Sequence, residues 1–370
     1  MYNPIKLRVH CFLYLLSMIF SFAAAGNPIV NHSRSLFIFG DSFLDTGNNN
    51  YINTSTFYQA NFRPYGTTYF RHPTGRFSDG RLISDFIAAF SDLPVAIPYL
   101  QPRFTDYERG VNFASGGAGA LVDTFKGYVI DLKTQVNYFK KVKTHLLKVT
   151  GNEKAESIIS RAVFLISIGF NDYSSQFLSD SVLLRSGGVS DYVGMVIGNM
   201  SQEIREIYDA GGRNFAVMNL PPLGCFPNLR LLNLLKNRSG CYTEVQVLAS
   251  AHNRALPKML HKLEKELTGF KYSLLLLNSL FRQRLKNLSQ YGFKNSRSAC
   301  CGSGKFRGEF SCGGNRSSKE YQVCENPNEY LFWDSIHANE MAYRQIANEI
   351  WEEPPRSGKK GPRSLQELFH

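Results

Sequence analysis

Five short runs of apolar, β-branched and aromatic residues restrict the fold of this chain more than any other feature. Their apolar residues are consecutive instead of alternating, which is typical of strands buried on both faces of a parallel sheet. Segments with helical periodicity lie between and after them, and this alternation predicts an α/β fold with right-handed crossovers. The five runs begin at Ser35, Gly110, Ala162, Asn214 and Tyr272.

Four helices are predicted from the segments around these runs. They begin near Asp131, Tyr192, Val245 and Asn339, and the last of them ends near Trp351. The second ends on a pair of glycines, which suits the left-handed residue that often closes a helix.

Residues 26–353 are predicted to form one domain, because the sequence shows no internal repeat and no linker between two cores. The segment from Ser296 to Asn326 is rich in Gly, Ser, Lys and Cys, and we interpret it as a loop pinned by disulfides. The end of the chain, residues 354–370, is rich in Pro, Gly and Lys, which predicts a loosely ordered basic tail.

The first 25 residues have the composition of a secretory signal peptide. Lys6 and Arg8 give a positive start, the apolar run Cys11–Phe22 follows, and residues 23–25 are alanines that suit a cleavage site. A membrane anchor is the alternative, but the run is short for a bilayer span and no later segment is long and apolar enough. We therefore expect a secreted, extracellular protein whose mature chain begins at Gly26.

Six cysteines remain after the predicted signal, and an even set in a secreted chain predicts three disulfides. A zinc site is the alternative, but two of the cysteines are adjacent and no C-x-x-C pair is present, which is poor spacing for metal ligands. The pairing stays open, although Cys225 with Cys241 is the pair we favour because it would close a single loop. The six are Cys225, Cys241, Cys300, Cys301, Cys312 and Cys324.

Six N-x-S/T sequons without proline predict surface glycans in a secretory chain. They begin at Asn31, Asn53, Asn199, Asn237, Asn287 and Asn315.

The net charge of +12 is scattered along the chain and forms no motif. A solvated basic surface is the simpler interpretation. A weak attraction to acidic polysaccharide or to anionic interfaces is the functional alternative. Nucleic acid is not expected as a partner outside the cell.

Glycine-rich and polar segments follow three of the predicted strands, where ligands bind in doubly wound sheets. GDS at 40–42 follows the first strand, SGGAG at 115–119 the second, and GFND at 169–172 the third. FWDSIHANE at 332–340 precedes the last helix. Each segment alone is an ordinary turn, but their common placement at one sheet edge predicts a catalytic site.

The residue types in these segments match the needs of acyl transfer. A serine hydroxyl such as that of Ser42 is a weak nucleophile until a base takes its proton, and His337 can be that base. Asp334 is three residues earlier and can orient the imidazole. Donors for the developing oxyanion can come from the Ser42 N–H, from the 115–119 loop and from the Asn171 amide.

This constellation resembles the GDSL esterase/lipase family of the SGNH hydrolases in its plant secreted form. The resemblance covers essentially the whole mature chain, in order and spacing. It implies a three-layer α/β/α sandwich with a five-stranded parallel sheet of flavodoxin type, an ester substrate, and an apoplast or cell-wall location. The matching segments are FIFGDSFLDTGNNNY, RFSDGRLISDFIA, GVNFASGGAGAL, ISIGFNDY and FWDSIHANE.

The resemblance also assigns roles by position. It implies that Ser42 is the nucleophile, that Asp334 and His337 complete a triad, and that Gly117 and Asn171 join Ser42 as oxyanion donors. The glycine at 117 is favoured over its neighbour at 116 by an ungapped match. Neither the residues nor the resemblance implies a metal or an organic cofactor.

The chain departs from the family pattern at two places. The first block reads GDSF in place of GDSL, and Ala338 and Asn339 stand where the family commonly has proline and threonine. Proline is pre-set for a first helical turn, so the start of the helix beside His337 is expected to differ.

Other polar residues near these segments are expected to have structural roles. Asp41 is expected to brace the Ser42 turn. Residues 71–81 could face a substrate, but their Gly and Pro residues indicate first of all a loop. Asp172 is expected to form a cap or a local hydrogen bond. Turn and cap roles are expected for Asp45, Asn48, Asn49 and Asn50, and surface or core positions for His72, His145, His252 and His261.

The leading hypothesis is a secreted serine hydrolase that cleaves carboxylic esters of lipids, small molecules or cell-wall polymers through an acyl-enzyme. One alternative is a secreted binding or modifier protein on the same fold. Another is an acyltransferase, because hydrolysis and transfer to an alcohol share the acyl-enzyme.

Overall fold

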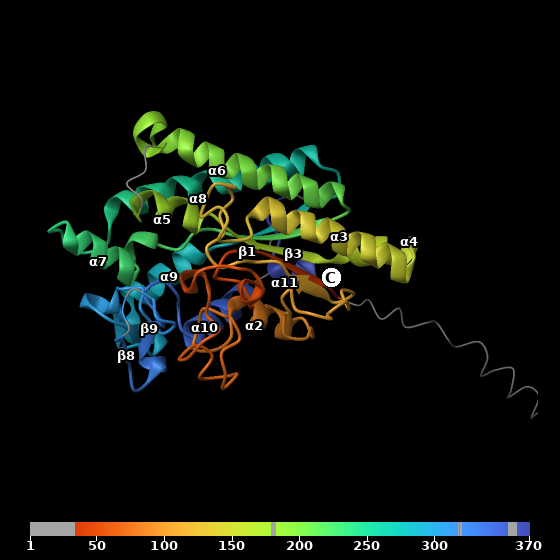
Figure 1. Ribbon diagram of the computed structural model, residues 1–370. Coiled ribbons are helices and arrows are strands. Elements are labelled where there is room, and N and C mark those ends of the chain that lie inside the picture. Colours follow the sequence, from red (N-terminus) through yellow and green to blue (C-terminus); the bar gives the residue numbers. More distant parts are fainter. Residues whose placement is uncertain (1–33, 179–182, 317, 319, 354–360) are drawn as a thin grey trace, which may run out of the picture. The chain divides into compact units, whose positions relative to one another are not determined.

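The computed structural model describes residues 34–178, 183–316, 318, 320–353 and 361–370 (Figure 1). The predicted signal peptide, the sequon at Asn31 and residues 354–360 of the predicted tail lie outside the described residues.

A five-stranded, all-parallel sheet forms the centre of the fold, as predicted from the five apolar runs. Each strand is short, and nearly all of the strand residues are buried. The strand order is β2-β1-β3-β4-β5, so the chain crosses from one side of β1 to the other after β2. The strands are β1 (Leu36–Gly40), β2 (Gly110–Asn112), β3 (Val163–Ser167), β4 (Asn214–Met218) and β5 (Lys271–Leu275).

Helices cover both faces of this sheet, which confirms the expected three-layer α/β/α fold (Figure 1). Phe37 and Phe39 of β1 point to one face, where their ring centroids lie 5.3 and 6.0 Å from that of Phe139 on α3. That face carries α3 (Leu132–Thr150), α6 (Leu183–Asp209) and α8 (Thr243–Glu266), and the other carries α2 (Ile83–Phe90), α10 (Glu340–Trp351) and α11 (Leu365–Leu368).

The four predicted helices correspond to α3, α6, α8 and α10. Helix α6 begins earlier than predicted, and its backbone is not helical at Gly188. The shorter helices are α4 (Asn152–Arg161), α5 (Phe170–Leu178), α7 (Pro227–Leu235) and α9 (Leu277–Lys286).

The segment from Ser296 to Asn326, called the insert below, is pinned by two disulfides, as expected. Cys300 pairs with Cys324, and Cys301 pairs with Cys312. The favoured pair Cys225–Cys241 is also present. The insert is not loop alone, because short strands run through it: β6 (Asn295–Ala299) pairs with β9 (Tyr330–Phe332), and β7 (Cys301–Gly302) pairs with β8 (Gln322–Val323).

The end of the chain differs from the expected loose tail. Leu365 and Leu368 of α11 are buried, and the Phe369 ring packs 5.7 Å from that of Trp351. Ser364 and Glu367 form a capping box that starts α11. The spacing of the leucines puts both on one side of a helical turn, so burial of their side chains holds residues 361–370 against the domain.

Four predicted glycosylation positions are exposed, namely Asn53, Asn237, Asn287 and Asn315, whereas Asn199 is partly buried in α6. Glycosylation at these positions stays a prediction. None of the helices in the described residues combines the length and apolarity that crossing a bilayer requires.

Candidate active site

Ser42 lies in a tight turn at the carboxyl end of β1. The turn can form because residue 40 is glycine: its φ is +147°, and a Cβ there would lie 2.1 Å from the Ser167 carbonyl oxygen. The Asp41 N–H donates to that same oxygen at 3.1 Å, so β3 fixes the end of β1. The side-chain amide of Gln135 on α3 accepts from the Gly40 N–H and donates to the Gly40 carbonyl.

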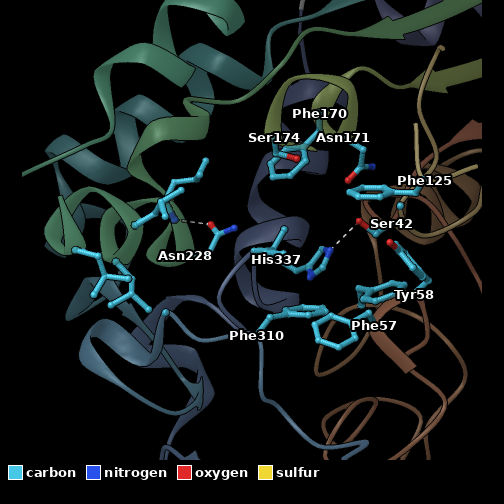
Figure 2. A pocket seen from close by; sticks show the side chains of 18 residues that line it. Ser42, Phe57, Tyr58, Phe125, Phe170, Asn171, Ser174, Asn228, Phe310 and His337 are labelled. Carbon is cyan, nitrogen blue, oxygen red and sulfur yellow. Dashed lines mark hydrogen bonds between the residues drawn. The ribbon is translucent and has the colours of Figure 1, made fainter. Parts of the chain in front are cut away.

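Ser42, His337 and Asp334 form a continuous hydrogen-bonded chain, of which Figure 2 shows the bond between Ser42 and His337. The Ser42 Oγ lies 2.8 Å from His337 Nε2, and His337 Nδ1 lies 2.8 and 2.9 Å from the two carboxylate oxygens of Asp334. A carboxylate only accepts, so Nδ1 carries the ring proton and Nε2 is the acceptor that faces the serine hydroxyl. The structure therefore brings together the three residues that the sequence analysis selected as nucleophile, base and orienting group.

Asp334 is fully buried and nevertheless held in its ionised form. Burial alone would raise the pKa of its carboxyl, but the neighbouring His337 and the hydroxyl of Tyr65 outweigh burial and lower that pKa below its usual value. The backbone N–H groups of Ile336 and His337 also donate to Oδ1, at 2.8 and 2.7 Å. The carboxylate can thus balance a positive charge on the imidazole.

Three N–H groups are available beside the Ser42 hydroxyl. In the described part of the chain, neither the Ser42 N–H nor the Gly117 N–H forms a hydrogen bond, and both residues line one cavity. The Asn171 side chain lines it too and donates one N–H to the Ala118 carbonyl at 2.9 Å, which orients the amide. Gly117 has a φ of +86°, and a Cβ there would lie 2.5 Å from the Tyr58 ring, so a side chain is disfavoured.

A buried carboxylate fixes the 115–119 loop relative to the Ser42 turn. Asp45 accepts from Gly47 and Asn48 with one oxygen and from Gly116 with the other, at 2.7 to 2.8 Å. Burial raises the pKa of Asp45 to about 6, although these N–H donors act against the rise. Asn49 adds a second link, because its amide donates to the Gly116 carbonyl at 2.9 Å.

The contact between Asp45 and the 115–119 loop was not predicted from the sequence. Turn and cap roles were predicted for Asp45 and its neighbours, and Asp45 does cap its own turn. The cap or local hydrogen bond predicted for Asp172 was wrong, because its carboxylate accepts from Ala120, Leu121 and Thr124, about fifty positions away in the chain. The excess of Asp and Asn after the first strand was the available signal.

The start of α10 is intact despite the departure from the family pattern. Asn339 is the N-cap, and its side-chain oxygen accepts from the Ala342 N–H at 2.8 Å. The 71–81 loop braces the next residue, because Asp79 accepts from the Glu340 N–H and Arg81 pairs with the Glu340 carboxylate, each at 2.8 Å. Asn339 stands where the family commonly has threonine, and both residue types are good N-caps, while Ala338 at the proline position precedes the cap and lies outside the first helical turn.

The Ser42 hydroxyl opens into a largely apolar cavity of about 350 Å³. In Figure 2, Ser42 and His337 point toward each other, with aromatic rings above and below them. Leucines of α7 form a further wall, and Phe310 and Gly308 come from the insert, which the sequence analysis did not connect to the site. The aromatic lining residues are Phe57, Tyr58, Phe77, Phe125, Phe170 and Phe310.

His337 is the histidine that lines this cavity. His252 is a core residue, as expected: it is fully buried, its Nδ1 lies 2.9 Å from the Tyr173 hydroxyl, and burial lowers its pKa to about 3. Within the residues that the structure describes, no group of three or more His, Cys, Asp or Glu side chains could hold a metal ion.

Comparison with known proteins agrees with this geometry. The family model described as GDSL-like lipase/acylhydrolase matches residues 36–350. A protein named GDSL esterase/lipase 5 from Arabidopsis thaliana is 52% identical over 342 residues, which is 92% of this chain and 88% of that protein. A protein named GDSL lipase from Tanacetum cinerariifolium is 46% identical over 320 residues, 86% of this chain and 84% of that protein. This chain belongs to the GDSL-like lipase/acylhydrolase family.

Proposed function

We propose that the protein is a serine esterase that hydrolyses carboxylic esters of apolar acyl groups through an acyl-enzyme on Ser42. The observation that carries the proposal is the chain from Ser42 through His337 to Asp334 at the mouth of an apolar cavity, beside N–H groups without partners in the described residues. The names of the relatives, esterase and lipase, support the same reaction class.

The reaction would begin with attack of the Ser42 oxygen on the ester carbonyl carbon while the hydroxyl proton moves to His337 Nε2. The Asp334 carboxylate balances the charge of the protonated ring. The carbonyl oxygen becomes negative and accepts from the N–H groups of Ser42, Gly117 and Asn171. The C–O bond to the alcohol then breaks, and His337 returns the proton to the departing alcohol.

The second half of the reaction repeats these steps with water. His337 takes a proton from water as the water oxygen attacks the acyl carbon, and the acid leaves as the proton returns to Ser42. The same residues serve both halves, so the proposal needs no further catalytic group.

The cavity supports an apolar acyl group as the part of the substrate that is bound next to Ser42. Its walls are aromatic rings and the side chains of Leu229, Leu231, Leu232 and Leu235 on α7. Burial of each methylene group is worth about 0.8 kcal/mol, so affinity should grow with acyl length until the cavity is full.

We also propose that the protein acts outside the cell, in the apoplast or cell wall. The three disulfides support an oxidising compartment. The lysines Lys133, Lys141 and Lys148 are exposed on α3 and support the weak attraction to acidic polysaccharide that the net charge suggested.

The proposal is tested with Ser42→Ala, an ester panel of increasing acyl length and a serine-directed phosphonate. Removal of the nucleophile should lower kcat by roughly 10⁶-fold, as for other serine hydrolases, without a change in Tm. Ser174→Ala is the matched control, because Ser174 lines the same cavity. Near-normal turnover in Ser42→Ala would reject the nucleophile.

The same experiment separates the alternatives. Wild-type protein that is neither labelled nor active would support the binding-protein hypothesis. Labelling with acyl transfer to an added alcohol in excess of hydrolysis would support an acyltransferase.

A further inference from the structure

The fourth partner of the Asp334 carboxylate is a tyrosine from a distant loop. The Tyr65 hydroxyl lies 2.6 Å from Asp334 Oδ2, and both side chains are buried. Tyr65 and Asp334 are 269 positions apart, so the fold alone brings them together. Burial raises the pKa of the Tyr65 hydroxyl well above its usual value, which keeps it protonated and able to donate.

The direction of this hydrogen bond is fixed by a second contact. Nη1 of Arg316, in the insert, lies 2.7 Å from the Tyr65 oxygen. A guanidinium group can only donate, so the Tyr65 oxygen accepts from Arg316 and its single proton must point to Asp334. Arg316, Tyr65, Asp334, His337 and Ser42 thus form one directed chain from the insert to the proposed nucleophile.

Arg316 is held in place by backbone and rings, not by a carboxylate. Its Nε donates to the Thr56 carbonyl at 3.0 Å, and Nη2 donates to the Gln59 carbonyl. Its guanidinium carbon lies 4.0 Å from the centre of the Phe310 ring. Arg316 is 7% exposed, and it has no ion-pair partner among the described residues.

A buried charge without a direct partner is costly unless another charge balances it nearby. The anion that Arg316 reaches is Asp334, through the Tyr65 hydroxyl. We propose that Tyr65 and Arg316 are positioning residues that hold the Asp334 carboxylate in the orientation that His337 needs. This inference rests on the proposed function of Ser42, His337 and Asp334.

The chain also predicts a specific effect on pH dependence. Hydrolysis requires the neutral His337 ring, and the positive Arg316 opposes protonation of that ring. Loss of either Arg316 or Tyr65 leaves the Asp334 charge less balanced, which favours the protonated ring. The acidic limb of kcat/KM against pH should therefore move to higher pH.

The test compares Tyr65→Phe and Arg316→Met with matched controls. Tyr65→Phe should lower kcat by about tenfold to a hundredfold, the loss of one hydrogen bond to a charged group, with KM nearly unchanged because Tyr65 does not line the cavity. Arg316→Met should shift the acidic limb in the same direction, and Arg316→Lys should restore part of the loss. The double variant should lose little more than Tyr65→Phe, since Arg316 acts through Tyr65.

Two control variants remove a tyrosine hydroxyl and an arginine that are not hydrogen-bonded to Asp334 or to Tyr65. Tyr242 is buried and its hydroxyl accepts from Lys236, so Tyr242→Phe removes a buried tyrosine hydroxyl beside a cation without touching Asp334 and should leave the pH profile unchanged. Arg307 of the insert also donates to backbone carbonyls, those of Ala299 and Cys300, and serves as Arg307→Met. Equal losses in controls and variants, or a wild-type kcat and pH profile in folded Tyr65→Phe, would overturn the inference.

A readout without turnover keeps this inference separate from the proposed function. The ¹H and ¹⁵N shifts of the His337 Nδ1–H group report its hydrogen bond to Asp334, and they should differ from the wild-type values in Tyr65→Phe and Arg316→Met. An inactive, unlabelled wild type would reject the proposed function, while unchanged Nδ1–H shifts in both variants would reject the positioning role.

Discussion

The edge of the sheet and the insert contribute to the same cavity in different ways. The Ser42 turn and the 115–119 loop follow β1 and β2, and Asn171 follows β3 at the start of α5, so the register of the buried strands places them. The insert has only short strands, and two disulfides hold it. From the insert, Phe310 contributes an aromatic ring to the cavity wall, and Arg316 contributes a buried positive charge.

The two regions therefore have different roles in the site. Groups that would touch the reacting atoms lie where parallel strands end, because there the backbone is fixed by a full ladder of hydrogen bonds. Groups that shape and charge the surroundings come from a cross-linked segment, where the position of a side chain depends on covalent bonds and long-range contacts. The comparison predicts that damage at the sheet edge removes turnover, whereas damage in the insert weakens it.

The largest effect among the remaining tests is expected at the sheet edge, from Asn171→Ala. Loss of one oxyanion donor should lower kcat on the order of 10²–10³-fold, with little change in Tm and with phosphonate labelling of Ser42 slowed but not abolished. Asn228→Ala is the control, because Asn228 lines the same cavity and its side-chain oxygen accepts from the Leu229 N–H (Figure 2).

The measurement is kcat of the folded, purified variants, with Tm alongside. An unchanged kcat in Asn171→Ala, with a lower Tm, would show that the amide only satisfies the Ala118 carbonyl. It would also remove Asn171 from the proposed oxyanion site.

The sheet edge could be predicted from the sequence because its signals are local. Each strand is a consecutive apolar run, and parallel strands end at one edge, so residues far apart in sequence could be placed together without knowledge of their contacts. The common placement of the Ser42 turn, the 115–119 loop and Asn171 follows from this rule. Asp334 and His337 follow β9 of a separate two-stranded sheet, so their place beside Ser42 was predicted from their chemistry and from the family resemblance. The strand order could not be derived from the runs, because all five are similarly apolar.

The role of the insert could not be predicted in this way. Arg316 and Tyr65 are 251 positions apart, and no periodicity or motif marks either residue. Arg316 follows Cys312 closely in the chain, and the sequence left the pairing of Cys312 with Cys301 open. The tail was mispredicted for a different reason. Its basic composition suggested a loose segment, although the spacing of Leu365 and Leu368 in the sequence already indicated a helical turn with a buried side.

The second test removes the covalent support of the insert. Cys301→Ser with Cys312→Ser should lower kcat by about tenfold, the size of one lost hydrogen bond to a charged group, because Arg316 follows Cys312 by four positions. Loss of a loop closure of this size should also cost about 3 kcal/mol of unfolding free energy.

The control is Cys225→Ser with Cys241→Ser, which opens a loop of similar length around α7. Its Tm should fall comparably, but the leucines of α7 line the cavity proposed to bind the acyl group, so KM for long esters should rise more than kcat falls. The comparison between the two regions fails if both disulfide variants show the same changes in kcat and KM.

The smallest effect concerns a buried carboxyl at the sheet edge. Asp41 accepts from the Phe43 N–H at 3.0 Å, which confirms that it braces the turn, and burial raises its pKa from 3.8 to about 8. Between these two values the folded protein holds a proton that the unfolded chain has lost. The free energy of unfolding should therefore fall as pH rises toward 8, by about 1.4 kcal/mol per pH unit for one proton, and level off above it.

Asp41→Asn should remove this contribution, since an amide oxygen can still accept from the Phe43 N–H but does not titrate. Urea unfolding of wild type and variant between pH 5 and 9 measures the difference in slope. Between pH 6 and 8 the comparison isolates Asp41 from Asp45 and Asp79, whose pKa values burial raises only to about 6. Glu309→Gln, at an exposed carboxyl of the insert, is the control and should leave the slope as it is. Parallel slopes for wild type and Asp41→Asn would mean that the Asp41 carboxyl is ionised in the folded protein. Water would then reach this edge of the sheet more readily than the burial of Asp41 implies.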